Sequence, residues 1–343
     1  MNAEESRTSA CGRPCSSGST EHTANRRHML QSALAFAIAG VLPMSRAALA
    51  AGNVTRLVLV HGRSQQGKDP AALRAEWMDA LRRGARTLGH ALPVGIEVVL
   101  PFYGDALEAF TEQYDIPLTA DVQTRGAAID EDFLAFQAEI AESVRQSAGI
   151  SDELVDAEYG PNPRQKGPLN WEWVQAILRA IDKHGGGMSQ SALELFTRDV
   201  FLYTTRAGVR DEIDRIVASQ VTEAPTVVIG HSLGSVVAYN ILRSDRRSLN
   251  IPLFVTVGSP LGIRAIRDQL RPLRFPPPVQ AWYNAFDRRD VVALHSLDAT
   301  NFPVVPAIDN NPTVKNHTAN RHGIVGYLDD PDVVRHILDA LSV

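Results

Sequence analysis

The stretch that decides the fold is TVVIGHSLGS, residues 226–235. Its first four residues are rich in β-branched types, and the residues after it are apolar at helical spacing, so a strand, a tight turn and a helix follow one another directly. Glycines on both sides of Ser232 suit such a turn, because side chains there would collide with the strand and the helix. We therefore expect the Ser232 hydroxyl to project beyond the end of the strand.

A serine at such a turn is typical of a nucleophile. The backbone N–H of Leu233, at the start of the helix, would help to stabilise the oxyanion that forms when Ser232 attacks an acyl carbon. The pattern G-x-S-x-G alone arises by chance in about one chain in ten of this length. The strand before it and the helix after it favour the functional interpretation.

Upstream, the chain alternates short β-branched runs with helical periodicities. Residues 56–60 are typical of a buried strand, apolar residues at spacings of three and four predict a helix between Pro70 and Gly89, and residues 95–100 predict a second strand. This alternation predicts an α/β fold, with a mostly parallel, doubly wound sheet covered by helices on both faces.

The stretch from about residue 104 to residue 190 interrupts this rhythm. It holds acidic helical segments, a Gly-Pro turn, Trp171, Trp173 and the glycine run at residues 185–187. We interpret it as an inserted, mainly helical cap over the active site of a single domain spanning residues 51–343. Each tryptophan taken alone is more typical of a helical core than of a lid.

The first fifty residues differ from the rest. Arg26 and Arg27 precede an apolar run, residues 32–41, and Ala48-Leu49-Ala50 fits the rule for signal-peptide cleavage. Residues 1–50 thus resemble a twin-arginine export signal, with a general secretory signal or an uncleaved anchor as the alternatives. The apolar run is too short to span a bilayer. We expect a periplasmic or extracellular protein.

Composition excludes several classes of site and partner. Cys11 and Cys15 both lie within the predicted signal, so the mature chain would have no disulfide, no thiolate metal site and no cysteine nucleophile. The formal charge of −5 becomes −7 without the five arginines and three glutamates of residues 1–50. An acidic chain gives no reason to expect nucleic acid as a partner, and contact with a membrane surface has no support.

A second oxyanion donor is expected in the loop after the first strand, His61-Gly62-Arg63-Ser64, which we call the oxyanion loop. With this loop, the Ser232 turn and the motifs described below, the chain resembles the α/β-hydrolase superfamily of serine hydrolases, of the lipase and esterase type. The resemblance implies that the N–H of Arg63 pairs with that of Leu233. It also implies that His61 shapes the loop, with a role as catalytic base as the alternative.

The family order of nucleophile, acid and histidine places the acid downstream of Ser232. Residues 279–286 predict a strand that leads into Asp287-Arg288-Arg289-Asp290-Val291-Val292, which we call the acid loop. Asp290 resembles the family acid because a valine pair follows it. Asp287 is the alternative, and otherwise would cap the loop or pair with one of the arginines.

The catalytic histidine should precede the last helix, which Asp330 and Pro331 begin as cap and first-turn residue. His322, with Gly323 beside it and a tyrosine five residues later, resembles the family histidine. His317 is its rival. His336 falls within the helix and is more typical of a structural residue.

These residues predict that Ser232, His322 and Asp290 hydrolyse carboxylic esters through an acyl-enzyme. The segments at residues 257–262 and 282–287 also resemble the lipase-like group that includes the glycosylphosphatidylinositol inositol-deacylases. Small-molecule or lipid esters are the expected substrates, with no metal and no cofactor. Thioester or amide cleavage by the same residues, or a binding protein that retains the fold without catalysis, are the alternatives.

Overall fold

The computed structural model describes residues 54–342, apart from 119–121, 123–129, 162–163 and 186. The predicted export signal, its cleavage site and both cysteines lie outside the described residues. Within the part of the chain that is described, no helix is both long enough and apolar enough to cross a membrane.

The centre of the fold is a sheet of six strands in the order β2-β1-β3-β4-β5-β6, and every neighbouring pair is parallel. This confirms the predicted α/β class with a mostly parallel sheet. The last strand was not expected, because its Asp-Asn-Asn sequence has no β-branched residue. The strands are β1 (Arg56–Val60), β2 (Glu97–Val99), β3 (Thr226–His231), β4 (Ile251–Val257), β5 (Val279–Ala285) and β6 (Asp309–Asn311).

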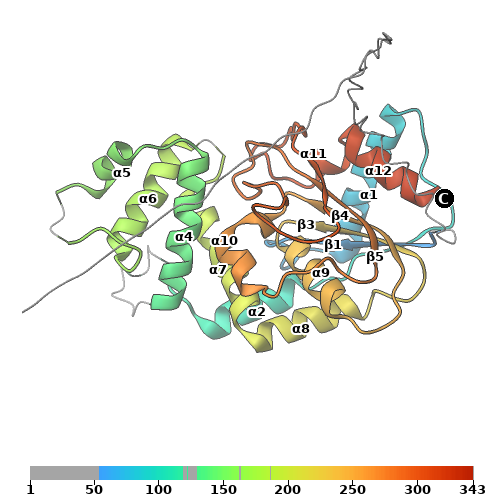
Figure 1. Ribbon diagram of the computed structural model, residues 1–343, viewed down its shortest axis with the longest axis horizontal. Coiled ribbons are helices and arrows are strands. Elements are labelled where there is room, and N and C mark those ends of the chain that lie inside the picture. Colours follow the sequence, from blue (N-terminus) through green and yellow to red (C-terminus); the bar gives the residue numbers. More distant parts are fainter. Residues whose placement is uncertain (1–53, 119–121, 123–129, 162–163, 186, 343) are drawn as a thin grey trace, which may run out of the picture. The chain divides into compact units, whose positions relative to one another are not determined.

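Helices cover both faces of the sheet (Figure 1). Along β1, Leu57 and Leu59 pack against one helical layer, whereas Val58 and Val60 pack against the other, as the two-residue period of a strand requires. The first layer consists of α1 (Pro70–Thr87), α11 (Val325–Leu328) and α12 (Pro331–Leu341).

The remaining helices form the opposite layer and a lobe beside it. They are α2 (Gly104–Tyr114), α4 (Glu131–Ser147), α5 (Asp152–Tyr159), α6 (Trp171–His184), α7 (Gln190–Thr205), α8 (Ala207–Ala218), α9 (Leu233–Ser244), the 3-10 turn η1 (Pro260–Gly262) and α10 (Arg264–Gln269).

Within this group, α9 packs directly on β1 and β3. The lobe consists of α4, α5 and α6, which belong to the predicted insertion and lie to one side of the sheet (Figure 1). In it, α6 packs against both α4 and α5. Trp171 and Trp173 are partly buried against the same hydrophobic core as these helices, which agrees with the core interpretation of the two side chains.

Capping side chains fix two of the helix starts that matter for the site. The Asp69 carboxylate accepts the N–H of Ala71 at the start of α1. The Asp330 carboxylate accepts two backbone N–H groups at the start of α12, where Pro331 occupies the first helical position, as predicted. Both helices pack on the sheet beside the loops that hold the candidate site.

Candidate active site

The candidate nucleophile, Ser232, lies in the sharp turn between β3 and α9. Its backbone has a φ of 54°, in a region that residues with a side chain rarely occupy. Its N–H donates to the Val257 carbonyl at 3.2 Å, and its own carbonyl accepts the Ser235 N–H at 2.9 Å. A side chain at Gly234 would collide with the Val60 carbonyl, so glycine allows the start of α9 to pack on the end of β1. The strand, turn and helix predicted from residues 226–235 are therefore present.

The structure brings together three residues that lie far apart in the sequence. His322 Nε2 is 2.9 Å from Ser232 Oγ, and His322 Nδ1 is 2.7 Å from Asp290 Oδ2. Ser232 is 1% exposed and Asp290 is fully buried. Because a carboxylate only accepts hydrogen bonds, Nδ1 carries the proton and Nε2 is free to accept the proton of the serine hydroxyl.

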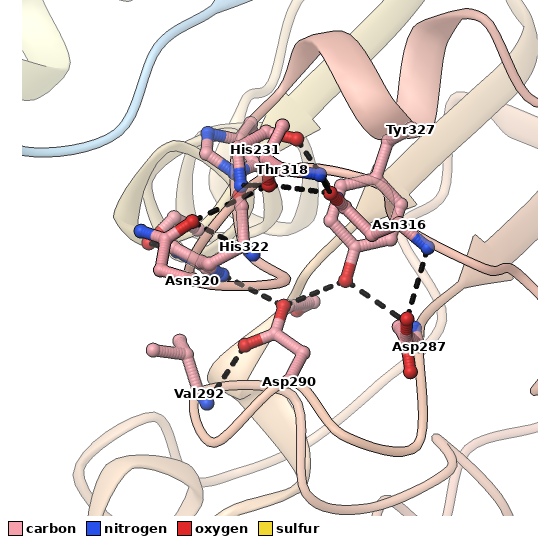
Figure 2. A network of polar contacts seen from close by, with 12 residues as sticks. His231, Asp287, Asp290, Val292, Asn316, Thr318, Asn320, His322 and Tyr327 are labelled. Atoms are coloured by element: carbon pink, nitrogen blue, oxygen red, sulfur yellow. Dashed lines mark hydrogen bonds and ion pairs between the residues drawn. The ribbon is translucent and has the colours of Figure 1, made fainter. Parts of the chain in front are cut away.

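Both oxygens of Asp290 have further donors. Oδ1 accepts the Val292 N–H at 2.9 Å, and Oδ2 accepts the Tyr327 hydroxyl at 2.6 Å in addition to the imidazole. Figure 2 shows Tyr327 and His322 converging on this carboxylate from different elements. Burial and the charge of Asp290 raise the pKa of Tyr327 well above its ordinary value, so its hydroxyl remains a donor.

Asp287, the other candidate acid, has a different set of contacts. One of its oxygens accepts the Arg289 N–H at 2.8 Å, and the other accepts the Asn316 N–H at 2.9 Å. It therefore joins the acid loop to the start of the segment Asn316–Gly323, which we call the histidine loop. Its carboxylate has no contact with an imidazole among the described residues.

The other histidines bond elsewhere. His317 Nε2 contacts the Asp329 carboxylate at 3.0 Å, and its side chain is 60% exposed. His336, on α12, stacks on Tyr283. Neither has a contact with Ser232.

Side chains within the histidine loop brace His322. Asn316 Oδ1 accepts the Thr318 N–H, and Asn316 Nδ2 donates to the Gly323 carbonyl at 2.8 Å. Asn320 Oδ1 accepts the N–H of His322 itself at 3.1 Å. Figure 2 shows these bonds linking Asn316, Thr318, Asn320 and the main chain of His322.

The oxyanion loop lies directly against the nucleophile. A methyl group on Gly62 would be 2.9 Å from Ser232 Cβ, so only a glycine allows this approach. The Gly62 carbonyl accepts from His61 Nδ1 at 2.7 Å, while His61 Nε2 accepts the Tyr103 N–H at 3.1 Å. Because the C=O and N–H of a trans peptide point in opposite directions, the imidazole also fixes the direction of the Arg63 N–H.

His61 and His231 are both held neutral. Burial lowers the pKa of His61 to about 4 and that of His231 to about 3. His231 Nε2 lies 2.7 Å from the His322 carbonyl and therefore donates to it, which ties the main chain of His322 to the end of β3. His61 has both ring nitrogens engaged by backbone groups and none directed at Ser232, as expected of a residue that shapes the loop.

A pocket of about 560 Å³ opens beside these groups, within the range of small-molecule sites. Gly62 and His322, which both lie against Ser232, form part of its wall. The wall mixes apolar and polar side chains from both helical layers of the fold. Among them are Gln65, Lys68, Trp77, Met188, Phe196 and Asn320.

The described residues contain no group of three histidine, cysteine or acidic side chains placed to hold a metal ion. No protein-family model matches the chain, and no curated protein matches it significantly.

Sequence reasoning missed three residues that support this site. The Tyr327 hydroxyl bonds to Asp290, His231 holds the main chain of His322, and Asp199 binds the side chain of Arg63. His231 lies directly before the nucleophile in the G-x-S-x-G pattern, and Tyr327 follows His322 by five residues, so sequence position is a signal for both. Asp199 has no distinguishing pattern in the sequence.

Proposed function

We propose that this chain is a serine hydrolase with the α/β-hydrolase fold and that it cleaves carboxylic esters. The observation that carries the proposal is the continuous chain of contacts from Ser232 Oγ to His322 Nε2 and from His322 Nδ1 to Asp290. A nucleophile, a base and an orienting carboxylate at hydrogen-bond distances form the arrangement that activates serine for acyl transfer.

Each group has a distinct task in this mechanism. Ser232 Oγ attacks the ester carbonyl carbon while His322 Nε2 removes its proton, and the negative charge collects on the former carbonyl oxygen. Asp290 holds the imidazole in the required tautomer and stabilises the imidazolium. The imidazolium then protonates the alcohol as the C–O bond breaks, and a water activated by the same imidazole hydrolyses the acyl-enzyme.

The oxyanion would be held by two backbone donors. The Leu233 N–H belongs to the first turn of α9, where backbone N–H groups have no partner within the helix. The Arg63 N–H follows Gly62, which touches Ser232. Donors that are already oriented before the reaction contribute much of the rate enhancement in such sites.

The order of elements supports the fold assignment. The nucleophile follows β3 at the centre of the sheet, the acid follows β5, and the histidine precedes the last helix. The pocket volume of about 560 Å³ would accommodate small-molecule esters or the ester group of a lipid, and thioesters and amides would use the same residues. We also propose that the protein is exported by a twin-arginine signal, because Arg26 and Arg27 precede the apolar run at residues 32–41 and the small-residue site at residues 48–50.

A comparison of serine variants tests the proposal. The parent protein should hydrolyse short-chain p-nitrophenyl esters, and Ser232→Ala should lower kcat by about 10⁴-fold or more while remaining folded. Ser219→Ala, at the exposed end of α8, is the matched control and should retain full activity. Turnover that survives in Ser232→Ala would refute the proposed nucleophile, and an inactive parent would favour a binding protein.

A further inference from the structure

The side chain of Arg63 reaches from the oxyanion loop to α7, a helix that the chain enters directly after the predicted insertion. Arg63 Nε lies 2.9 Å from Asp199 Oδ2, across 136 positions of sequence. The Asp199 side chain is 7% exposed and that of Arg63 is 20% exposed. The pair is thus largely removed from water.

Burying this ion pair carries a desolvation cost that its hydrogen bonds do not fully offset. Asp199 Oδ1 and Arg198 Nε are buried without a hydrogen-bond partner among the described residues, although the two atoms lie 3.6 Å apart. Burial raises the pKa of Asp199 above its ordinary value, against the opposing effect of Arg63 and Arg198. Apolar residues in place of a buried ion pair are often as stable or more so, so packing alone does not account for Asp199.

The geometry gives Asp199 a second role. Arg63 supplies one of the two proposed oxyanion N–H groups, and its backbone is restrained from one side by His61, whose ring binds the Gly62 carbonyl. The carboxylate of Asp199 restrains it from the other side, through the guanidinium. The peptide that carries the donor is therefore held at both ends.

The same helix also forms part of the substrate pocket. Phe196 and Ala192, one and two turns before Asp199, line the pocket together with Gly62 and Arg63. A displacement of α7 would therefore change the pocket wall and the oxyanion loop together.

We propose that Asp199 is a positioning residue for the oxyanion hole: through Arg63 it ties the oxyanion loop to α7, so that transition-state stabilisation depends on this helix. The inference rests on the proposed function. It makes α7 part of the catalytic apparatus and not only a wall for the substrate.

The test compares Asp199→Ala and Asp199→Asn with the parent enzyme on one p-nitrophenyl ester. Asp199→Ala should lower kcat by about 10-fold to 100-fold, less than the loss of a whole oxyanion donor, and should change KM by less than about threefold. Asp199→Asn keeps an acceptor for Arg63 Nε, so its kcat should lie between those of the parent enzyme and Asp199→Ala. The inhibition constant of a boronic acid, which forms a tetrahedral adduct with Ser232, should rise by the same factor as kcat falls.

Asp245→Asn is the matched control. Asp245 is another arginine-paired carboxylate, and its side chain is 10% exposed. It pairs with Arg247 beyond the C-terminal end of α9, and neither residue lies on α7 or in the oxyanion loop. Its substitution should leave kcat and boronic-acid affinity unchanged. Equal kcat losses in the Asp199 and Asp245 variants, or an unchanged kcat in Asp199→Ala, would overturn the inference.

A double variant keeps the test decisive if Asp199→Ala does not fold. Arg63→Met with Asp199→Asn removes both charges of the pair and approximately preserves volume, so neither partner is left as a buried charge without the other. The inference predicts a folded protein with reduced kcat, and parental kcat would overturn it. An inactive parent enzyme would instead refute the proposed function itself.

Discussion

The acid-base half of the site and its oxyanion half are supported by different parts of the molecule. Asp290, His322 and Tyr327 lie on segments that follow β5 or precede α12, and they bond mainly to one another. Their geometry follows from the sheet and its own loops. This half should keep its arrangement when the helices between β2 and β3 are altered.

The oxyanion half depends on a partner outside the sheet. Arg63 follows β1, but its side chain binds Asp199 on α7, within the long helical stretch between β2 and β3. In the proposed mechanism, proton transfer and oxyanion stabilisation would therefore be separable. Changes in the helical stretch between β2 and β3 should impair oxyanion stabilisation more than proton transfer.

The largest expected effect within the acid-base half distinguishes its two aspartates. Asp290→Asn should lower kcat by about 10⁴-fold, because an amide no longer selects the tautomer with the proton on His322 Nδ1. Asp287→Asn should retain most of the activity of the folded protein, since Asp287 joins two loops through backbone N–H groups. Steady-state kinetics on p-nitrophenyl esters, with circular dichroism to establish folding, measure both.

The opposite ranking would assign the acid to Asp287 and contradict the geometry. The two variants serve as each other's controls, because both residues are buried in the same loop.

The sequence led to this loop but did not separate its two aspartates from first principles. Both aspartates lie in the acid loop after β5. They differ in their contacts: Asp290 contacts His322 and Asp287 contacts Asn316, and both partners are distant in the sequence. The strand, turn and helix around Ser232 could be predicted because each has a local pattern. The polar strand β6 and the pair of Arg63 with Asp199 have no such pattern, since long-range packing alone creates them.

Low pH should lower the free energy of unfolding, because each half of the site contains a buried neutral histidine. Burial lowers the pKa of His61 to about 4 and that of His231 to about 3, whereas both would titrate near 6.5 in the unfolded chain. The unfolded chain therefore binds more protons below pH 6.5, and stability falls as the pH decreases toward the folded values. At pH 5 the loss should be roughly 2 kcal/mol for each of the two histidines.

Urea unfolding at pH 7 and pH 5 measures this loss. His317→Gln, at a histidine whose side chain is 60% exposed, is the control variant. A stability that is constant between pH 7 and pH 5 would show that the two buried imidazoles are not kept neutral.

A smaller effect is expected from Tyr327→Phe, which removes one donor to Asp290 without changing the ring. We expect kcat to fall by about 10-fold with little change in KM, because the carboxylate keeps His322 and the Val292 N–H. Tyr239→Phe is the matched control: its hydroxyl donates to the Arg274 carbonyl, and its loss should lower stability without lowering kcat. Equal kcat in the parent and Tyr327→Phe would show that Asp290 does not need this bond.

The central claim is that Ser232 is a nucleophile activated by His322. Labelling with a fluorophosphonate probe, followed by mass-spectrometric mapping of the modified peptide, tests it most directly because the probe reacts only with activated serines. We predict one adduct, on Ser232, and its loss in His322→Ala while His317→Ala is still labelled. An adduct on another residue, or labelling that does not depend on His322, would contradict the claim.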